Sequence, residues 1–115
     1  MQYMLLLHID EKAMQNSTQE ERGQRYGAYA AYTQAMKEAG LYQAGAPLQP
    51  TSTATTVRVN NGKSSVLNGP YAEVKEQLGG YYLIDAPDLD SALSWAARCP
   101  AASTGAVEVR PIMAM

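Results

Sequence analysis

An uninterrupted apolar run near the start of the chain limits the possible folds more than any other feature. The run Tyr3-Met4-Leu5-Leu6-Leu7 lies within a predicted strand, Gln2 to Ile9, and shows no alternation of apolar and polar residues. A strand with one face in water should alternate, so we expect this strand to be covered on both faces. The fold must therefore supply a separate cover for each face.

Helical and extended patterns follow in an order that predicts an α+β fold. A capping box at Ser17-Thr18-Gln19-Glu20, with Ser17 as the N-cap, predicts a helix that runs to about Ala39 and stops at Gly40. Asp88 predicts the start of a second helix, which ends near Arg98. The remaining strands are expected at 41–46, 55–60, 63–67, 80–85 and 107–112, with a loop or short helix at 70–78. The expected inward faces are Tyr26, Tyr29, Ala30, Thr33 and Met36 in the first helix, and Leu89, Ala92, Leu93, Trp95 and Ala96 in the second.

This order, β-α-β, a hairpin and β-α-β, predicts a ferredoxin-like split βαβ fold with an inserted β-hairpin. Asn61-Gly62 is a strong two-residue hairpin turn. Two helices would cover one face of the sheet and leave the other bare. Because the first strand needs both faces covered, the simplest second cover is another copy of the chain. We therefore expect one domain, residues 1–115, in a homodimer.

Composition excludes several classes of protein. The 115 residues are 46% hydrophobic and 17% charged, which indicates a globular domain and not a disordered chain. The net charge of -2 gives no electrostatic basis for nucleic-acid binding. No apolar run approaches the length of a membrane span, and the apolar start is too short for a signal peptide. The single cysteine, Cys99, fits a reducing compartment, so we expect a cytoplasmic protein.

The segment from Asn68-Gly69-Pro70-Tyr71 to Gly79-Gly80-Tyr81 resembles the signature of the DGPF domain family, part of the YCII-related proteins. That pattern has Asp-Gly-Pro-Phe, then Glu-x-Lys-Glu, then Gly-Gly and an aromatic residue. Asn68 and Tyr71 depart from it. The resemblance extends from Tyr3 to Pro111 and implies a dimeric α+β barrel, but it implies no particular reaction.

His8 is the only histidine and shares a predicted strand face with Met4, Leu6 and Asp10. With Asp10 it could form a proton-transfer pair, in which the carboxylate fixes the imidazole tautomer. The alternative is a lone histidine at a pocket rim or dimer seam. Some YCII-related members are proposed to use a His-Asp pair with the histidine on the first helix, but the first helix here has none.

Glu73, Lys75 and Glu76 are the charged part of the resembling segment. A buried Glu73 could act as a base with His8, and Lys75 could hold an anionic substrate. The alternative is that these charges pair with one another or with a partner subunit. Tyr29 and Tyr82, with Lys75 and Glu76, are our predicted ligand-binding residues, because a tyrosine offers a ring and a polar tip.

The remaining motif residues have a structural interpretation. Asn68 can bond backbone amides ahead of it, Gly69 allows special dihedrals and Pro70 stiffens the exit. Gly79-Gly80 suggests a bulge or a close approach of backbone or ligand.

Two functions fit the sequence. The first is binding of a small organic molecule in a pocket of the dimeric barrel, with or without acid–base catalysis. The second, which the resemblance implies, is a noncatalytic regulatory or ligand-binding module associated with an extracytoplasmic-function sigma factor. The sequence has one His and one Cys and no pair of metal ligands at a typical spacing, so we expect no metal. It also lacks a dinucleotide-binding fingerprint, so we expect no cofactor.

Overall fold

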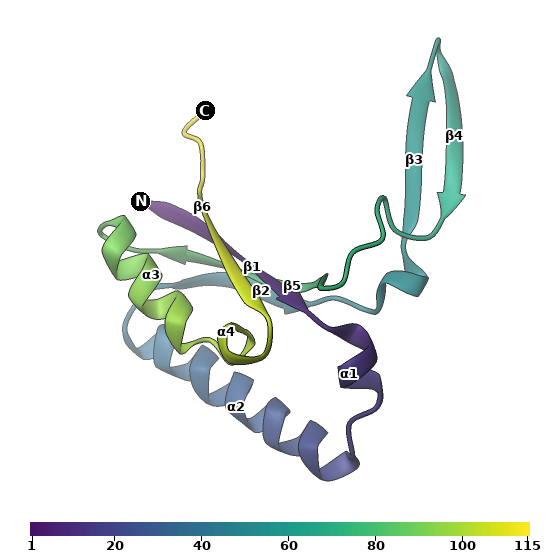
Figure 1. Cartoon of the computed structure of the whole chain (residues 1–115). Coiled ribbons are helices and arrows are strands. Elements are labelled where there is room, and N and C mark those ends of the chain that lie inside the picture. Colours follow the sequence, from purple (N-terminus) through teal and green to yellow (C-terminus); the bar gives the residue numbers. More distant parts are fainter.

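Four strands form an antiparallel sheet in the order β2-β5-β1-β6 in the computed structural model, which describes residues 1–115 (Figure 1). The strands are β1 (Gln2–Ile9), β2 (Tyr42–Pro47), β5 (Gln77–Asp85) and β6 (Ala106–Pro111). With two helical crossovers, this order is the ferredoxin-like split βαβ arrangement. The predicted α+β fold class is confirmed.

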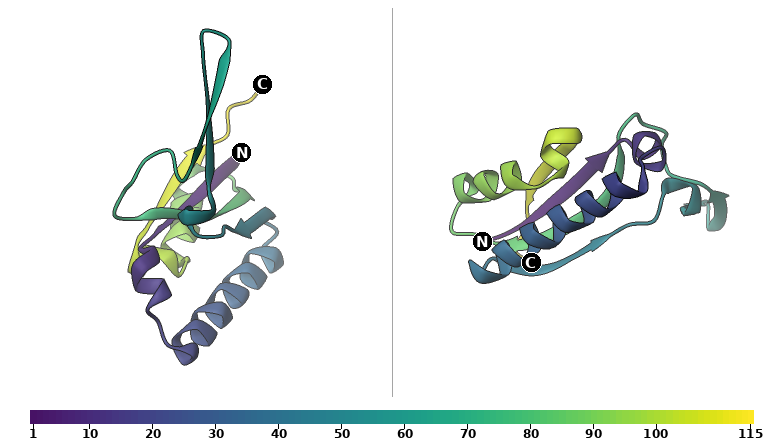
Figure 2. Two further views of the ribbon diagram at one scale, coloured as in Figure 1. Left: turned by 90° about the vertical axis from the view of Figure 1, so that its right-hand side faces the viewer. Right: turned by 90° about the horizontal axis from the view of Figure 1, so that it is seen from below.

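The helices lie on one face of this sheet and leave the other face bare (Figures 1 and 2). They are α1 (Glu11–Gln15), α2 (Gln19–Glu38), α3 (Leu89–Arg98) and α4 (Ala101–Thr104). A 3-10 turn, η1 (Thr51–Thr53), lies apart from them between β2 and β3. The short helices α1 and α4 were not predicted, because neither is long enough to show an apolar period. No helix has the length and apolar character needed to cross a membrane.

The central strand β1 presents two different faces. Tyr3, Leu5 and Leu7 are at most 5% exposed and belong to the core on the helical side. Met4 and Leu6 point to the bare side and are half-buried. The odd-numbered face is therefore covered as predicted, whereas the even-numbered face has no cover within one chain.

The N-cap of α2 is Thr18, one residue later than predicted. The Thr18 hydroxyl accepts a hydrogen bond from the Glu21 amide at 3.1 Å, and the Glu21 carboxylate accepts one from the Thr18 amide at 3.0 Å. The expected box of Ser17 and Glu20 was wrong because the Ser17 hydroxyl donates to the Met14 carbonyl and closes α1 instead.

The buried stripe of α2 differs from the predicted one. Tyr32 and Met36 are buried, whereas Tyr26 is 80% exposed. The Tyr32 hydroxyl donates to the Trp95 carbonyl at 2.8 Å, which satisfies its polar tip and links α2 to α3.

The buried stripe of α3 consists of small residues. Ala92 and Ala96 are buried, while Leu89 and Leu93, predicted to point inward, are each 47% exposed. The small side chain of alanine allows the helix to approach its neighbours closely, and the two leucines lie outside this stripe.

The strand β5 begins at Gln77, three residues earlier than predicted, and residues 70–76 form no helix. The early start contains a register shift: Leu7 pairs with Gly80, but His8 pairs with Leu78. Gly79 is therefore the extra residue of a β-bulge, which confirms the expected irregularity at Gly79-Gly80.

The strands β3 (Thr55–Asn60) and β4 (Lys63–Asn68) form a separate hairpin that extends away from the main sheet (Figure 1). Asn61 and Gly62 both have positive φ, 51° and 78°, as a type I′ turn requires, so the predicted turn is confirmed. The radius of gyration is 16.0 Å, against roughly 13 Å for a compact chain of this length. The extended hairpin accounts for this difference.

Asn68 is the last residue of β4, and its side chain forms no hydrogen bond, contrary to its predicted turn role. Gly69 has φ +129° and its amide donates to the Ala54 carbonyl at 2.7 Å. The expected special dihedral at Gly69 is confirmed, whereas the stiffening role of Pro70 stays a prediction.

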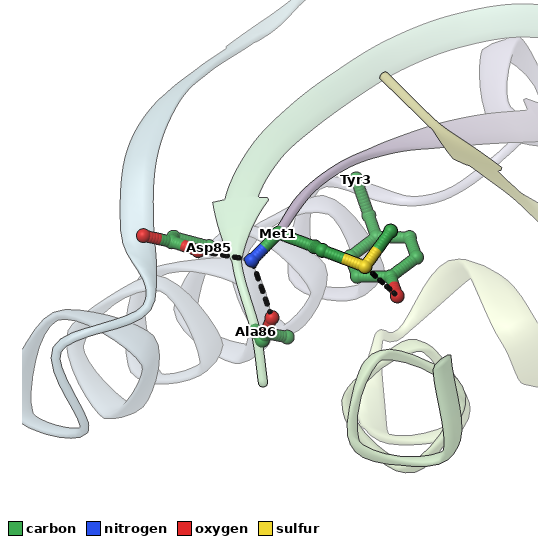
Figure 3. A network of polar contacts seen from close by, with 4 residues as sticks. All are labelled: Met1, Tyr3, Asp85 and Ala86. Carbon is green, nitrogen blue, oxygen red and sulfur yellow. Dashed lines mark hydrogen bonds and ion pairs between the residues drawn. The ribbon is translucent and has the colours of Figure 1, made fainter. Parts of the chain in front are cut away.

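Polar contacts hold the beginning of β1 to the end of β5 (Figure 3). The Met1 ammonium group bonds the Asp85 carboxylate and the Ala86 carbonyl, each at 3.0 Å. The charged pair is largely exposed and contributes little stability on its own. The backbone bond from the Ala86 amide to the Met1 carbonyl, 2.9 Å, continues the ladder at this end.

Replacement of Gly80 by Val should lower the thermal midpoint clearly. A Cβ at Gly80 would lie 3.1 Å from the Ala46 carbonyl oxygen and 3.4 Å from the Pro47 Cα. The cause is close backbone packing and not positive φ, which Gly80 lacks, and overpacking of this kind costs about 1–3 kcal/mol. Asn68→Asp, at an exposed position, is the matched control and should change stability by less than about 0.5 kcal/mol. Equal effects in thermal melts would contradict the constraint at Gly80.

Candidate ligand-binding groove

A groove of about 770 Å³ lies between α2 and the adjoining ends of β2 and β5, on the helical side of the sheet. Small residues make its floor, because Gly45, Ala46, Gly79 and Gly80 leave the space beneath the helix unfilled. The groove lies within one chain, so a further pocket between subunits stays a prediction. Its lining residues are Leu7, Ile9, Met14, Arg22, Arg25, Tyr26, Tyr29, Ala30, Thr33, Gln34, Lys37, Tyr42, Gly45, Ala46, Pro47, Leu48, Gly79, Gly80, Tyr81 and Tyr82.

One wall of the groove is a packed group of aromatic rings. The Tyr82 ring contacts Tyr32 edge to face at 5.5 Å between ring centroids, and Tyr42 at 6.3 Å. A Cβ at Gly45 would lie 2.6 Å from the Tyr82 ring, so the glycine allows this ring to lie against β2. The wall is therefore fixed by its own packing, with no ligand needed to order it.

Two tyrosine hydroxyls lie at this wall, and they differ in whether they have a hydrogen-bond partner. The Tyr82 hydroxyl is hydrogen-bonded to the Thr33 hydroxyl at 2.9 Å. The half-buried Tyr29 has no hydrogen-bond partner in the chain, so its hydroxyl is free to bind a ligand. Burial raises the pKa of Tyr29 to about 12 and also raises the pKa of Tyr82. Both hydroxyls are therefore neutral at physiological pH, and Tyr29 can donate a hydrogen bond.

The predicted site residues fall into two groups. Tyr29, Tyr82, Gly79 and Gly80 line the groove. His8 does not, because its side chain belongs to the bare face of the sheet.

The pair of His8 and Asp10, one of the two alternatives for this histidine, is not formed. Asp10 is the N-cap of α1 and accepts a hydrogen bond from the Ala13 amide at 3.2 Å. His8 Nε2 lies 3.2 Å from Glu108 Oε1, a residue of the neighbouring strand β6. The antiparallel pairing of β1 with β6 creates this contact between residues that are far apart in sequence.

Glu73, Lys75 and Glu76 lie in the irregular segment before β5, away from the groove. Glu73 and Lys75 are exposed and Glu76 is half-buried. None of the three forms an ion pair within the chain. Their proposed roles in ligand binding and catalysis, like that of His8, stay predictions.

The cations of the groove were not predicted from the sequence. Arg22, Arg25 and Lys37 line it from α2. Arg22 and Arg25 precede Tyr29 by seven and four residues, which places all three on one side of the helix. That pattern was available in the sequence, but these arginines resembled a solvated helix face.

The folded protein should lose stability as the pH rises from about 10 toward 12. Unfolded tyrosine ionises near pH 10, whereas Tyr29 holds its proton to about 12, so the unfolded state is favoured over this range. Tyr29→Phe removes this group and should make the decline in the free energy of unfolding less steep, measured by urea denaturation at pH 8 and pH 11. Tyr32 and Tyr82, whose pKa values burial also raises, keep part of the decline. An identical decline in both proteins would contradict the buried environment of Tyr29.

Comparison with known proteins places this fold in a family. The sequence model of the YCII-related domain family matches residues 1–115. An uncharacterised protein of Rhizobium meliloti (strain 1021) is 40% identical over 114 residues, which cover 97% of this chain and 92% of that protein.

A solved structure with a similar fold is 5-chloro-2-hydroxyhydroquinone dehydrochlorinase (TftG) from Burkholderia phenoliruptrix AC1100, in complex with 2,5-dihydroxybenzoquinone. The TM-score is 0.55 at 17% identity, and the match covers 98% of this chain and 94% of the other. At this identity the likeness concerns the fold alone. Because the family model spans the whole sequence and a relative shares 40% of its residues, the chain belongs to the YCII-related domain family.

Proposed function

We propose that this protein binds a small organic molecule in the groove between α2 and the sheet. The observation that carries the proposal is the free Tyr29 hydroxyl beside a prepacked aromatic wall in a groove of about 770 Å³. Ligand sites of this size are mostly apolar and contain a few polar groups that fix orientation. The similar fold of a dehydrochlorinase that binds 2,5-dihydroxybenzoquinone supports a ring-sized ligand, by analogy of fold only.

The lining of the groove favours binding over acid–base catalysis. None of its residues is His, Cys, Asp or Glu, the side chains that most often move protons near neutral pH. A catalytic version of this function would use His8 and Glu73, as predicted from the sequence. His8 would then act with Glu108 on the bare face of the sheet, where only a second subunit could complete a site.

The second candidate is a noncatalytic regulatory module associated with an extracytoplasmic-function sigma factor. A groove lined by no His, Cys, Asp or Glu fits this candidate. Such a module would respond to the ligand through α2. Its cytoplasmic location stays a prediction.

Filling the groove with a large side chain should abolish ligand binding. Ala30 lines the groove and is exposed, so Ala30→Trp should occupy the space without disturbing the core. Ala28, exposed on the same helix but outside the groove, provides the matched control Ala28→Trp. We expect aromatic fragments to shift amide NMR signals of Tyr29 and Tyr82 in the wild type and in Ala28→Trp, but not in Ala30→Trp. Equal binding by all three proteins would place the ligand elsewhere.

We also propose a homodimer formed through the bare face of the sheet. Only 14 of 115 residues are buried in one chain, which is few for a domain of this length. Met4 and Leu83 lie directly opposite each other on that face, and Leu6 lies beside them. An apolar surface of this kind is typical of an interface, and a two-fold related copy would match it.

Leu83→Lys should convert the dimer into a monomer, because it would place a charge at the centre of the proposed interface. Leu93→Lys is the matched control. Leu93 is a half-exposed residue of α3, on the helical side of the sheet, so its replacement should leave the dimer intact. Light scattering after gel filtration measures both masses. A monomeric wild type, or a dimeric Leu83→Lys, would refute this interface.

A further inference from the structure

The charges that line the groove are all positive. Arg22, Arg25 and Lys37 contribute cations, and no aspartate or glutamate lines it. The chain as a whole carries a net charge of -2, so this concentration of positive charge is local to the groove. Neither arginine nor the lysine forms an ion pair with a carboxylate of the chain.

The cations occupy two separate ends of the groove. Lys37 lies twelve residues after Arg25, which corresponds to about 18 Å along the helix axis. Its ammonium group lies 5.1 Å from the centre of the Tyr42 ring, with which it forms a cation–π interaction. Arg22 and Arg25, less than one turn apart, therefore form the end at which one small anion could meet two cations.

The two guanidinium groups are held in place but keep unused donors. Arg22 Nη2 donates to the Gln15 carbonyl at 3.2 Å, and Arg25 Nη2 donates to the Ser17 hydroxyl at 3.2 Å. Each guanidinium has five N–H donors, so several remain available. These two hydrogen bonds anchor the arginine side chains to Gln15, at the end of α1, and to Ser17, just before α2. The side chains therefore lose less conformational entropy when a ligand binds.

The nearest carboxylates are engaged elsewhere. Glu11 lines a smaller, adjoining cavity of about 370 Å³, which shares Ile9, Met14, Arg22, Leu48 and Gly79 with the groove. Its two oxygens accept hydrogen bonds from the Thr51 amide and hydroxyl, at 2.9 Å and 2.8 Å. Glu21 caps α2 through the Thr18 amide. Hydrogen bonds to Thr18 lower the pKa of Glu21, and Arg25 also contributes to lowering it. Neither carboxylate forms an ion pair with Arg22 or Arg25.

Aromatic surface adjoins the arginine end. Tyr26 and Tyr29 follow Arg22 and Arg25 at four-residue spacing on the same side of α2, and both line the groove. The free Tyr29 hydroxyl can donate to a polar substituent of a bound ring. A molecule with an acidic group on an aromatic ring would satisfy the cations, the apolar wall and this hydroxyl together.

We infer that the groove selects small aromatic anions, with the acidic group at Arg22 and Arg25 and the ring toward Tyr29. This inference rests on the proposed ligand-binding function and names its ligand class. The guanidinium fork suits a carboxylate, which it can bind through two parallel hydrogen bonds.

Benzoate and benzamide, which have the same ring and nearly the same shape but differ in charge, test the inference by NMR titration of the full-length protein. Benzoate should bind at least about tenfold more tightly, as expected for a charge-assisted hydrogen bond, and its affinity should fall with added salt. Arg25→Gln should remove this preference for benzoate and leave benzamide unchanged. Arg58→Gln, on the hairpin outside the groove, is the charge-matched control and should behave as the wild type.

The outcomes separate this inference from the proposed function. Equal affinity for benzoate and benzamide, with shifts at Tyr29, would overturn the selection of anions and leave ligand binding in the groove intact. A preference for benzoate that survives Arg25→Gln and Arg22→Gln together would overturn the assigned position of the acidic group. The absence of shifts with either compound would overturn the inference, and the Ala30→Trp comparison would then decide the proposed function by itself.

Discussion

Burial of the odd-numbered face of β1 is the constraint on which the rest of the structure depends. This strand is hydrogen-bonded along both edges, to β5 and to β6, and its Tyr3, Leu5 and Leu7 side chains reach the centre of the core. Full burial of one such side chain contributes about 1.5–3 kcal/mol. A shift of one residue would exchange the two faces, so the same burial that places the helices also fixes which side chains point to the bare face.

The bulge at Gly79 links this strand to the groove. A Cβ at Gly79 would overlap the end of the Ile9 side chain, so a larger residue there would force Ile9 to move. Gly79 and its neighbour Gly80 also line the groove, where the missing side chains leave space under α2. One pair of residues thus satisfies a packing demand of the sheet and provides room for a ligand.

The helix α2 has two halves with different environments. Its C-terminal half buries Tyr32 and Met36 and is held to α3 through the Trp95 carbonyl. Its N-terminal half, with the exposed Tyr26, contains no buried residue, and the groove runs along both halves, from Arg22 to Lys37. A rigid half that positions a less buried half is common at binding sites, because the ligand completes the packing of the second half. The chemistry of the groove therefore follows from the incomplete burial of one helix.

The sequence by itself determined the order of the six strands and the two long helices, the Asn61-Gly62 turn and the Asp88 cap. Each of these depends on residues a few positions apart, so local chemistry is sufficient. Only the tertiary structure decided which distant side chains meet. His8 contacts Glu108, 100 residues away, because β1 pairs with β6, whereas proximity in sequence had suggested Asp10. Strand register and helix rotation are set by the packing of the whole core, and no local pattern encodes them.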